Sequence, residues 1–232
     1  MKNRKYPTNN VYWFIPERFE YIFANQANKK REKLLSRYKE KLTNKNFSLI
    51  VDCCMGGVLY HELGLQFKSP FINLSVSTHD YLKLLKNLDY YLKQDIAEIP
   101  SKESYPLGSP GGGIILRFHH YKNFGEARDA WNRRKIRVDF NNLFLIMTDG
   151  YGNLFDSKER ISDDDFKEFL ALPYKKLFVT NDKNKKKIKS NEVIYLKKYR
   201  HNYMVYPYHI NLIGKGERML EEYFDIISWL NN

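Results

Sequence analysis

Residues 47–57 read FSLIVDCCMGG, an apolar run followed by an acid, two cysteines, a methionine and two glycines. Phe47–Val51 has the length and composition of a buried strand, and Val58–Leu65 follows with a helical pattern that Gly64 ends. A strand, a short turn and a helix in this order form the first half of a βαβ unit. The turn either packs the helix tightly on the strand or holds a thiol beside a phosphate or acyl group.

Short apolar runs alternate with helical patterns along the rest of the chain. The strand-like runs are Pro70–Val76, Ile114–Phe118, Leu143–Met147, Leu177–Thr180 and Val193–Leu196. The helical patterns are Tyr81–Gln94, Phe124–Arg137, Asp163–Leu170 and Met219–Leu230. The glycine- and proline-rich stretch Ser101–Gly113 is expected to form a loop without regular structure. The alternation predicts an α/β fold with a mostly parallel, Rossmann-like sheet and helices on both faces.

The first 45 residues differ from the rest in composition and in hydrophobic pattern. They are predicted to form a basic arm with a helix over Phe19–Leu42, and residues 46–232 are predicted to form the α/β domain. The 232-residue chain has a formal net charge of +12. Such a charge favours an anionic partner, such as nucleic acid, anionic lipid or a phosphorylated small molecule, although a solvated helix face is the plainer interpretation. Nucleic acid is disfavoured because no reader motif accompanies the basic residues.

The two cysteines, Cys53 and Cys54, are neighbours and therefore do not build a disulfide framework. No CxxC motif and no spaced Cys/His set are present, so no structural zinc site is expected. Reduced thiols and the lack of any apolar run near ~18 residues indicate a soluble, cytoplasmic protein, with peripheral contact to the inner face of the membrane as a further possibility.

Ligands of parallel α/β sheets bind at the carboxyl ends of the strands, which is where DCCMGG falls. Cys54 would lie near a helix N-terminus, where the helix dipole favours a thiolate. The N–H groups of Gly56 and Gly57 would be placed to hold an oxyanion or a phosphate. The alternative is that both glycines only permit a tight turn and that the cysteines are small core residues.

Three further predicted strands also end in polar residues. After the second strand come His79, a candidate base, and Asp80, its candidate orienting partner; helix capping is the alternative for Asp80. After the third come His120, the preferred acid/base candidate, and Tyr121; a structural histidine is an equally good interpretation.

The fourth strand ends at Asp149, which is placed to bind a sugar hydroxyl, a ribose or a metal, although Asp-Gly is also an ordinary turn. Arg134, in the helical pattern before this strand, is a candidate phosphate ligand, with a solvated helix face as the alternative.

An ordered set of segments carries a resemblance to a known family over about Asn46 to Leu230. The segments are DCCMGG, LGLQFKSPFINL, HDYLKLLKNLDYYL, YPLG, HHYKNFGEARDAWNRR, NNLFLIMTDGYG and YFDIISWLN. The sequence resembles the uncharacterised bacterial family often labelled exopolysaccharide biosynthesis protein, domain of unknown function nineteen-nineteen. That family usually has Asn-Asn-Cys-Trp-Gly-Gly where this chain has residues 52–57, so three positions match: Cys54, Gly56 and Gly57. Further matches are Asp80-Tyr81, His120-Tyr121, Trp131 and Asp149. The resemblance implies an α/β fold and a role in surface-polysaccharide synthesis.

An analogy at the level of the fold suggests an acyl donor for the reaction. Some capsular polysaccharide acetyltransferases, which bind coenzyme A, also have a cysteine where a strand meets a helix, and only Cys54 matches here. We therefore expect a transferase that modifies a lipid-linked or polymeric saccharide, with a coenzyme A thioester as the favoured acyl donor. Cys54 would be the nucleophile or a positioning group, His120 the base, Asp80 the orienting group and Asp149 the sugar ligand. The alternatives are a nucleotide-sugar-dependent glycosyl- or phosphotransferase and a non-enzymatic binding or scaffold protein of polysaccharide assembly.

Overall fold

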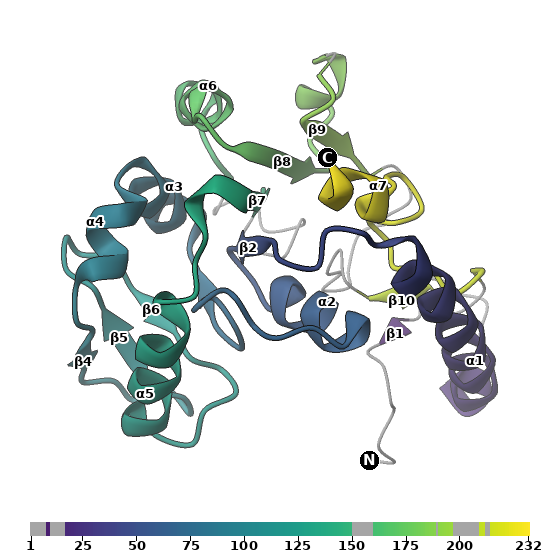
Figure 1. The fold of residues 1–232 in the computed structure, drawn as a ribbon, viewed down its shortest axis with the longest axis horizontal. Coiled ribbons are helices and arrows are strands. Elements are labelled where there is room, and N and C mark those ends of the chain that lie inside the picture. The colour runs from purple at the N-terminus through teal and green to yellow at the C-terminus, as the bar shows by residue number, and fades with distance from the viewer. Residues whose placement is uncertain (1–7, 10–16, 150–159, 189, 197–208, 212–213) are drawn as a thin grey trace.

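The fold was analysed in a computed structural model of the chain. The structure describes residues 8–9, 17–149, 160–188, 190–196, 209–211 and 214–232 (Figure 1). All nine predicted site residues fall within these ranges. In the described residues, no helix is long and apolar enough to cross a membrane.

A four-stranded parallel sheet forms the centre of the fold, in the order β2-β7-β8-β9. Its strands are β2 (Ser48–Val51), β7 (Leu143–Thr148), β8 (Lys175–Thr180) and β9 (Val193–Tyr195). Every residue of β2 and β7 is buried, as expected for parallel strands covered on both faces. The predicted parallel sheet and its first strand are thus confirmed.

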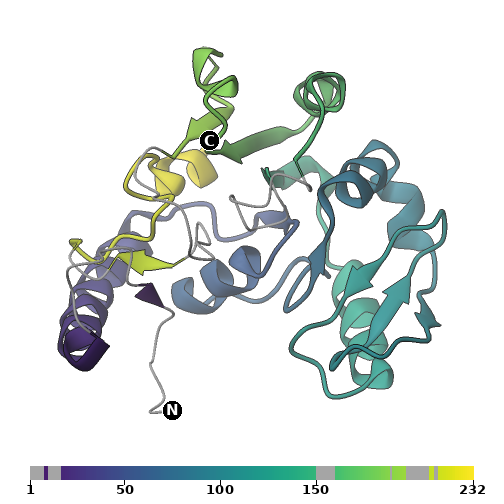
Figure 2. The same ribbon diagram turned by 180° about the vertical axis from the view of Figure 1, so that it is seen from behind.

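A second sheet corrects the expectation of one mostly parallel, Rossmann-like sheet. It is antiparallel, in the order β3-β6-β5-β4. Its strands are β3 (Ser75–Val76), β4 (Ala97–Ile99), β5 (Leu107–Ser109) and β6 (Leu116–Arg117). In Figure 2 the teal strands of this sheet lie toward the opposite end of the molecule from the purple helix α1. The runs ending at Val76 and Phe118 therefore extend into a separate sheet.

Strand β5 also corrects the expectation that Ser101–Gly113 contains no regular element. Gly108 lies in the middle of β5. A Cβ atom on Gly108 would come within 2.9 Å of Phe124 Cε2 and 3.0 Å of Phe118 Cε2. The glycine is therefore required by the two aromatic rings that pack over the strand, and here it does not mark a turn.

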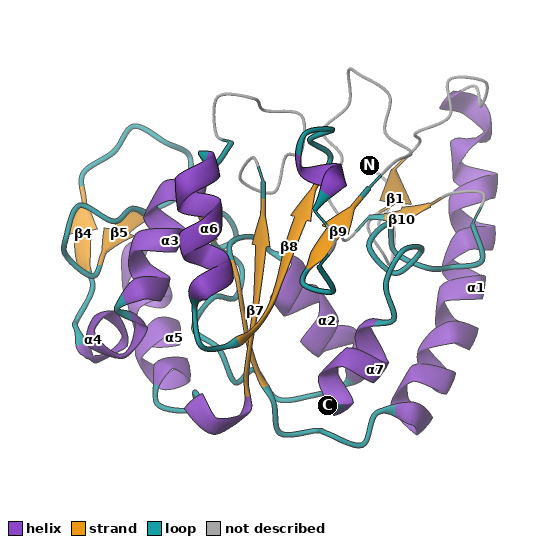
Figure 3. Cartoon of the chain, turned by 90° about the horizontal axis from the view of Figure 1, so that it is seen from above, coloured by secondary structure: helices purple, strands orange, loops and turns teal. Residues whose placement is uncertain are grey.

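Helices cover both faces of the parallel sheet, as predicted (Figure 3). One face carries α2 (Met55–Leu63) and α7 (Ile226–Asn231), which pack on alternate residues such as Leu49 and Phe144. The opposite face carries α3 (Thr78–Lys86), α4 (Leu88–Lys93), α5 (Phe124–Lys135) and α6 (Asp163–Ala171). Short 3-10 turns span Phe140–Asn142 and Lys185–Lys187.

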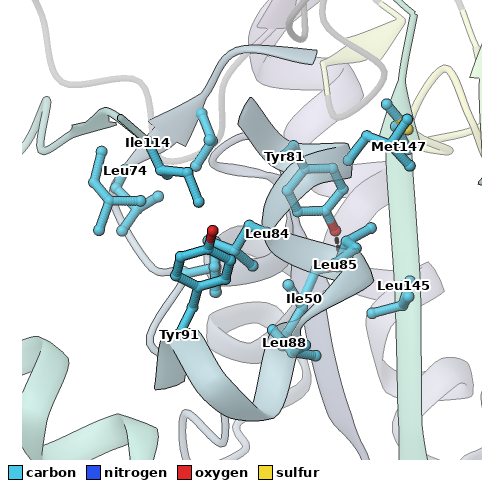
Figure 4. Close-up of a cluster of buried hydrophobic side chains, with 14 of the residues drawn as sticks. Ile50, Leu74, Tyr81, Leu84, Leu85, Leu88, Tyr91, Ile114, Leu145 and Met147 are labelled. Atoms are coloured by element: carbon cyan, nitrogen blue, oxygen red, sulfur yellow. Dashed lines mark hydrogen bonds between the residues drawn. The ribbon is translucent and has the colours of Figure 1, made fainter. Parts of the chain in front are cut away.

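The core on the second face is built from β7 and α3 (Figure 4). Leu145 and Met147 point from β7 toward Tyr81 and Leu85 of α3. The Tyr81 hydroxyl donates a hydrogen bond to the Ile50 carbonyl at 2.9 Å, so the helix is tied to β2 as well. This contact holds the start of α3 at the carboxyl end of the parallel sheet.

Helix α1 (Glu17–Lys41) packs on the domain through a buried charge network. The Arg31 guanidinium is fully buried and pairs with Glu62 of α2 at 2.6 Å and with Glu221 at 2.5 Å. Arg218 pairs with Glu62 from the other side. The network joins α1, α2 and the C-terminal segment, and the pair β1 (Thr8–Asn9) and β10 (Ile210–Asn211) lies beside it.

Candidate functional site

The carboxyl ends of β2 and β7 are joined by a buried carboxylate. Asp52 Oδ2 accepts hydrogen bonds from the Thr148 backbone N–H at 2.7 Å and from Thr148 Oγ1 at 2.8 Å. The Asp52 side chain has no solvent exposure, and this burial raises its pKa to about 7. Asp52 therefore fixes the start of the β2–α2 turn against the neighbouring strand.

Helix α2 begins immediately after the turn, with Cys54 as its N-cap residue. A Cβ atom on Gly56 would lie 3.1 Å from Val51 Cγ2, and one on Gly57 would lie 3.1 Å from Ile72 Cγ2. The two glycines thus let the first turn of α2 pack closely on β2 and on the segment before β3. The first-turn N–H groups have no carbonyl four residues earlier within the helix to which they could donate.

The structure places the Cys54 thiol at this turn but does not favour its thiolate. Cys54 is partly buried, and its Sγ lies 3.9 Å from the Leu74 carbonyl oxygen. Burial raises its pKa to about 11, which outweighs the expected stabilisation by the helix N-terminus. Burial also raises the pKa of Cys53 well above its usual range. Both groups are therefore neutral thiols near pH 7.

Ser75 and His119 form a hydrogen-bonded pair next to this turn. Ser75 Oγ lies 2.5 Å from His119 Nε2, and the serine is 5% exposed. The residues on either side of Ser75 contact the turn: the Leu74 carbonyl faces Cys54, and the Val76 N–H donates to the Asp52 carbonyl at 2.9 Å. The pair is therefore held beside the N-terminus of α2.

The environment of His119 favours the neutral form of its ring. Burial lowers the pKa of His119, and the positive neighbours His120 and Arg117 lower it further, while Glu103 opposes them. The His119 ring packs edge-on against Tyr105, with ring centroids 4.2 Å apart. A neutral imidazole with its proton on Nδ1 accepts the hydroxyl proton of Ser75 at Nε2, which is the arrangement of a nucleophile and its general base.

His120, the histidine preferred from the sequence, is exposed to solvent one residue further on. Tyr121 donates a hydrogen bond to the Ile72 carbonyl at 3.0 Å, and Arg134 donates to the Tyr121 hydroxyl at 2.6 Å. Arg134 also lies over the Phe67 ring, 5.0 Å from its centroid. Tyr121 and Arg134 are thus brought together, and their hydrogen bonds link α5 to the segment that precedes β3.

His79 and Asp80 do not form the pair expected from the sequence. The Asp80 carboxylate accepts from the Ile115 N–H at 3.2 Å, and its backbone N–H donates to the N-cap residue Ser77. The His79 side chain is 56% exposed and lies 3.7 Å from Asp165 of α6. Asp80 positions Ile115, the residue immediately before β6, and His79 faces a groove between α3 and α6.

Asp149 is held inside the protein, where it is 1% exposed. Its carboxylate accepts from the Thr180 hydroxyl at 2.7 Å and from the Ile161 N–H at 3.2 Å. Lys185, also buried, brings its Nζ to 3.8 Å. These contacts use both carboxylate oxygens to fasten β7, β8 and the start of α6.

Ser75 and His119 are not among the site residues predicted from the sequence. In the sequence, the only signal for His119 was the His-His pair, of which one member had to face inward because neighbouring residues of an extended chain point to opposite sides. Ser75 gave no signal, because a serine in an apolar run is ordinary. Across the described ranges, no group of three or more His, Cys, Asp or Glu side chains is arranged to hold a metal ion.

The fold and this site define an α/β protein with a Ser–His pair beside a helix N-terminus at the edge of its central sheet. A sequence model of the family described as "Domain of unknown function (DUF1919)" matches residues 25–231, and the chain belongs to that family. The chain is also similar to an uncharacterized protein of Haemophilus influenzae, with 30% identity over 207 residues that span 89% of this chain and 95% of the relative.

Proposed function

We propose that the protein is an acyltransferase of bacterial surface-polysaccharide synthesis that moves an acyl group from a coenzyme A thioester to a sugar hydroxyl. The observation that carries the acyl-transfer part is the hydrogen bond between Ser75 Oγ and His119 Nε2 beside the first turn of α2. The saccharide part rests on the sequence resemblance described above. The lipid-linked or polymeric acceptor would be met in the cytoplasm, at the inner face of the membrane.

In this proposal Ser75 is the nucleophile and His119 the general base. Ser75 Oγ attacks the thioester carbonyl carbon while its proton passes to His119 Nε2. The negative charge that develops on the carbonyl oxygen is stabilised by N–H groups of Gly56 and Gly57 in the first turn of α2. When the C–S bond breaks, the leaving coenzyme A sulfur takes the proton from His119, which leaves an ester on Ser75.

The second half of the reaction reverses these roles. A sugar hydroxyl attacks the ester carbonyl and gives its proton to His119 Nε2, and the proton returns to Ser75 Oγ as the C–O bond to serine breaks. His119 carries the extra proton only within each half-reaction and begins both halves as the neutral base, the form that its lowered pKa favours. Cys54 is then a neutral neighbour that positions the Leu74 carbonyl, in place of the nucleophilic role expected from the sequence.

The basic face of α1 supports a place at an anionic surface. Lys29, Lys30, Lys33 and Arg37 are exposed on this helix, whereas Arg31 is buried in the charge network. Each basic residue near an anionic membrane contributes about 1 kcal/mol of attraction. The same charge favours approach of coenzyme A, which carries phosphate groups.

The neighbouring histidines provide a matched test. The purified protein is incubated with acetyl-CoA, and acetylated peptides are identified by mass spectrometry while free thiol release is followed. We expect one acetyl group on Ser75, and a loss of thiol release of about 10²–10⁴-fold in His119→Ala, because general-base catalysis contributes about that much. The exposed His120→Ala serves as the control and should keep the wild-type rate.

Three outcomes would change the proposal. Acetylation of Cys54 in place of Ser75 would return the nucleophile to the thiol. Equal rates in the two histidine variants would remove His119 from the reaction. Thermal stabilisation by nucleotide sugars with Mg²⁺ or Mn²⁺, without stabilisation by coenzyme A, would replace the acyltransferase by the glycosyl- or phosphotransferase alternative.

A further inference from the structure

A cavity lies next to the Ser–His pair, between the β4–β5 hairpin and the start of α5. Its volume is about 240 Å³. This is below the range of about 300–1,000 Å³ that accommodates drug-sized ligands, so the cavity has room for one sugar ring and not for a nucleotide. Its walls include Glu98, Glu103, Ser104, Tyr105, Lys122 and Phe124.

The lining alternates apolar rings with hydrogen-bonding groups. Tyr105 and Phe124 contribute aromatic faces, and Ser104 and the two glutamates contribute hydroxyl and carboxylate oxygens. A pyranose presents the same alternation, with C–H groups on its faces and hydroxyl groups around its edge. An aromatic side chain that also has a polar end, such as tyrosine, suits both parts of such a ligand.

The charge of the cavity favours a neutral sugar over the negatively charged coenzyme A donor. Glu98 and Glu103 supply two carboxylates against the single ammonium group of Lys122. The chain as a whole carries +12, so the cavity is locally acidic on a basic protein. Carboxylates repel phosphate and carboxylate ligands and accept hydrogen bonds from hydroxyl groups. The cavity therefore favours an uncharged or amino-bearing sugar.

Tyr105 connects the cavity to the reacting groups. It lines the cavity and also packs edge-on against the His119 ring, at a centroid distance of 4.2 Å. The Phe118 N–H donates to the Pro106 carbonyl at 3.0 Å, which ties the hairpin loop to the residue before His119. A ligand in the cavity is thus separated from the general base by a single side chain.

The walls are held in place before any ligand arrives. The missing side chain of Gly108 gives the Phe124 ring its position. Asn123 caps α5 by accepting from the Glu126 N–H at 2.9 Å, and the Ser101 hydroxyl accepts from the Glu103 N–H at 3.0 Å. A preformed wall reduces the ordering cost of binding.

We propose that this cavity is the acceptor subsite, in which an uncharged or amino-bearing pyranose of the saccharide acceptor lies on Tyr105. The assignment rests on the proposed transferase function, and binding can be measured without turnover. The probes are methyl glycosides of glucose, galactose and N-acetylglucosamine, with the glycoside of glucuronic acid as the anionic comparison. Saturation-transfer NMR on the full chain reports which sugar protons contact the protein.

Ser104→Trp fills the cavity from its exposed rim, and Ser36→Trp, on the exposed face of α1, is the matched control. We expect saturation transfer to the ring protons of the neutral glycosides from the wild type and from Ser36→Trp. Ser104→Trp should bind the neutral glycosides at least tenfold more weakly than the wild type does. The wild type should bind the glucuronide at least tenfold more weakly than it binds the neutral glycosides. Failure of all neutral glycosides to bind the wild type, equal binding by Ser104→Trp, or equal binding of the glucuronide would overturn the assignment.

The Ser75→Ala variant separates this inference from the proposed function. If it and the wild type bind sugar at the cavity while the wild type transfers no acyl group, the proposed function fails and the cavity stands as a sugar-binding site only. If the wild type acylates sugars and Ser104→Trp does so at the same rate and KM, the subsite fails and the transferase stands.

Discussion

Replacing Asp52 by asparagine should change how the stability of the protein depends on pH. Two donors of Thr148, its backbone N–H and its hydroxyl, reach the same oxygen of Asp52, Oδ2. The amide oxygen of an asparagine can accept both bonds, so the link between β2 and β7 is kept. What the substitution removes is the ionisable group, which in the native state is fully buried.

The sign and size of the effect follow from the raised pKa. Asp52 titrates near pH 7 when folded and near its ordinary value of 3.8 when unfolded. The native state therefore holds the proton more tightly, and the free energy of unfolding falls as pH rises between these two values. Each unit of pKa difference corresponds to about 1.4 kcal/mol, so the total loss is about 4 kcal/mol, of which roughly 2.5 kcal/mol falls between pH 5 and pH 8.

Urea unfolding of the wild type and Asp52→Asn at pH 5 and pH 8 measures this difference. The lowered pKa of His209, about 4, gives the opposite slope in both proteins and cancels in the comparison. Asp225→Asn is the control without a slope: the Ser228 N–H lowers the pKa of Asp225 below its ordinary 3.8, so the charge is present in both states and the stability difference from the wild type should be the same at pH 5 and pH 8. A stability difference between wild type and Asp52→Asn that does not grow with pH would refute the reasoning.

Three further substitutions or reactions test other parts of the structure. Arg31→Met leaves buried carboxylates with lost partners and should cost about 3–5 kcal/mol in urea unfolding, whereas the exposed Lys33→Met on the same helix should stay within about 0.5 kcal/mol. Because its pKa is about 11, Cys54 should react with iodoacetamide at pH 8 about 100-fold more slowly than an ordinary thiol, with buried Cys53 slower still; a rate at Cys54 equal to that of glutathione would contradict the burial argument. Ser77→Ala removes the cap of α3 and should lower the free energy of unfolding by about 1 kcal/mol, and an unchanged value would show that the cap bond contributes nothing.

The parallel sheet could be predicted from the sequence because its signal is local. The segments Phe47–Val51 and Leu143–Met147 are unbroken apolar runs, which is the pattern of strands buried on both faces. Strand β3 could not be assigned to its sheet in this way. It has two paired residues, Ser75 and Val76, and its antiparallel partner lies in β6, about 40 residues further along. Partner choice at that separation is set by tertiary packing and not by periodicity.

Helix boundaries show the same limit on a smaller scale. The predicted helix Tyr81–Gln94 is two helices in the structure, α3 and α4, which meet at Asn87. Asn87 adopts φ −136° and ψ 44°, outside the helical region, while the apolar spacing continues on both sides. A hydrophobic pattern records which residues face the core, and it is unchanged by a single residue at which the chain turns.

The position of the β2–α2 turn at the carboxyl edge of the parallel sheet could be predicted, because a strand followed by a glycine-rich turn and a helix brings the helix N-terminus there. The sequence does not show which polar residues are buried. Asp149 and Cys54 both follow strands, yet the Asp149 carboxylate is hydrogen-bonded to Thr180 and lies near Lys185, and Cys54 is a neutral thiol. Of the two adjacent histidines, the inward one meets Ser75. Which member of such a pair turns inward depends on how β6 ends against β3, and that contact exists only in the folded chain.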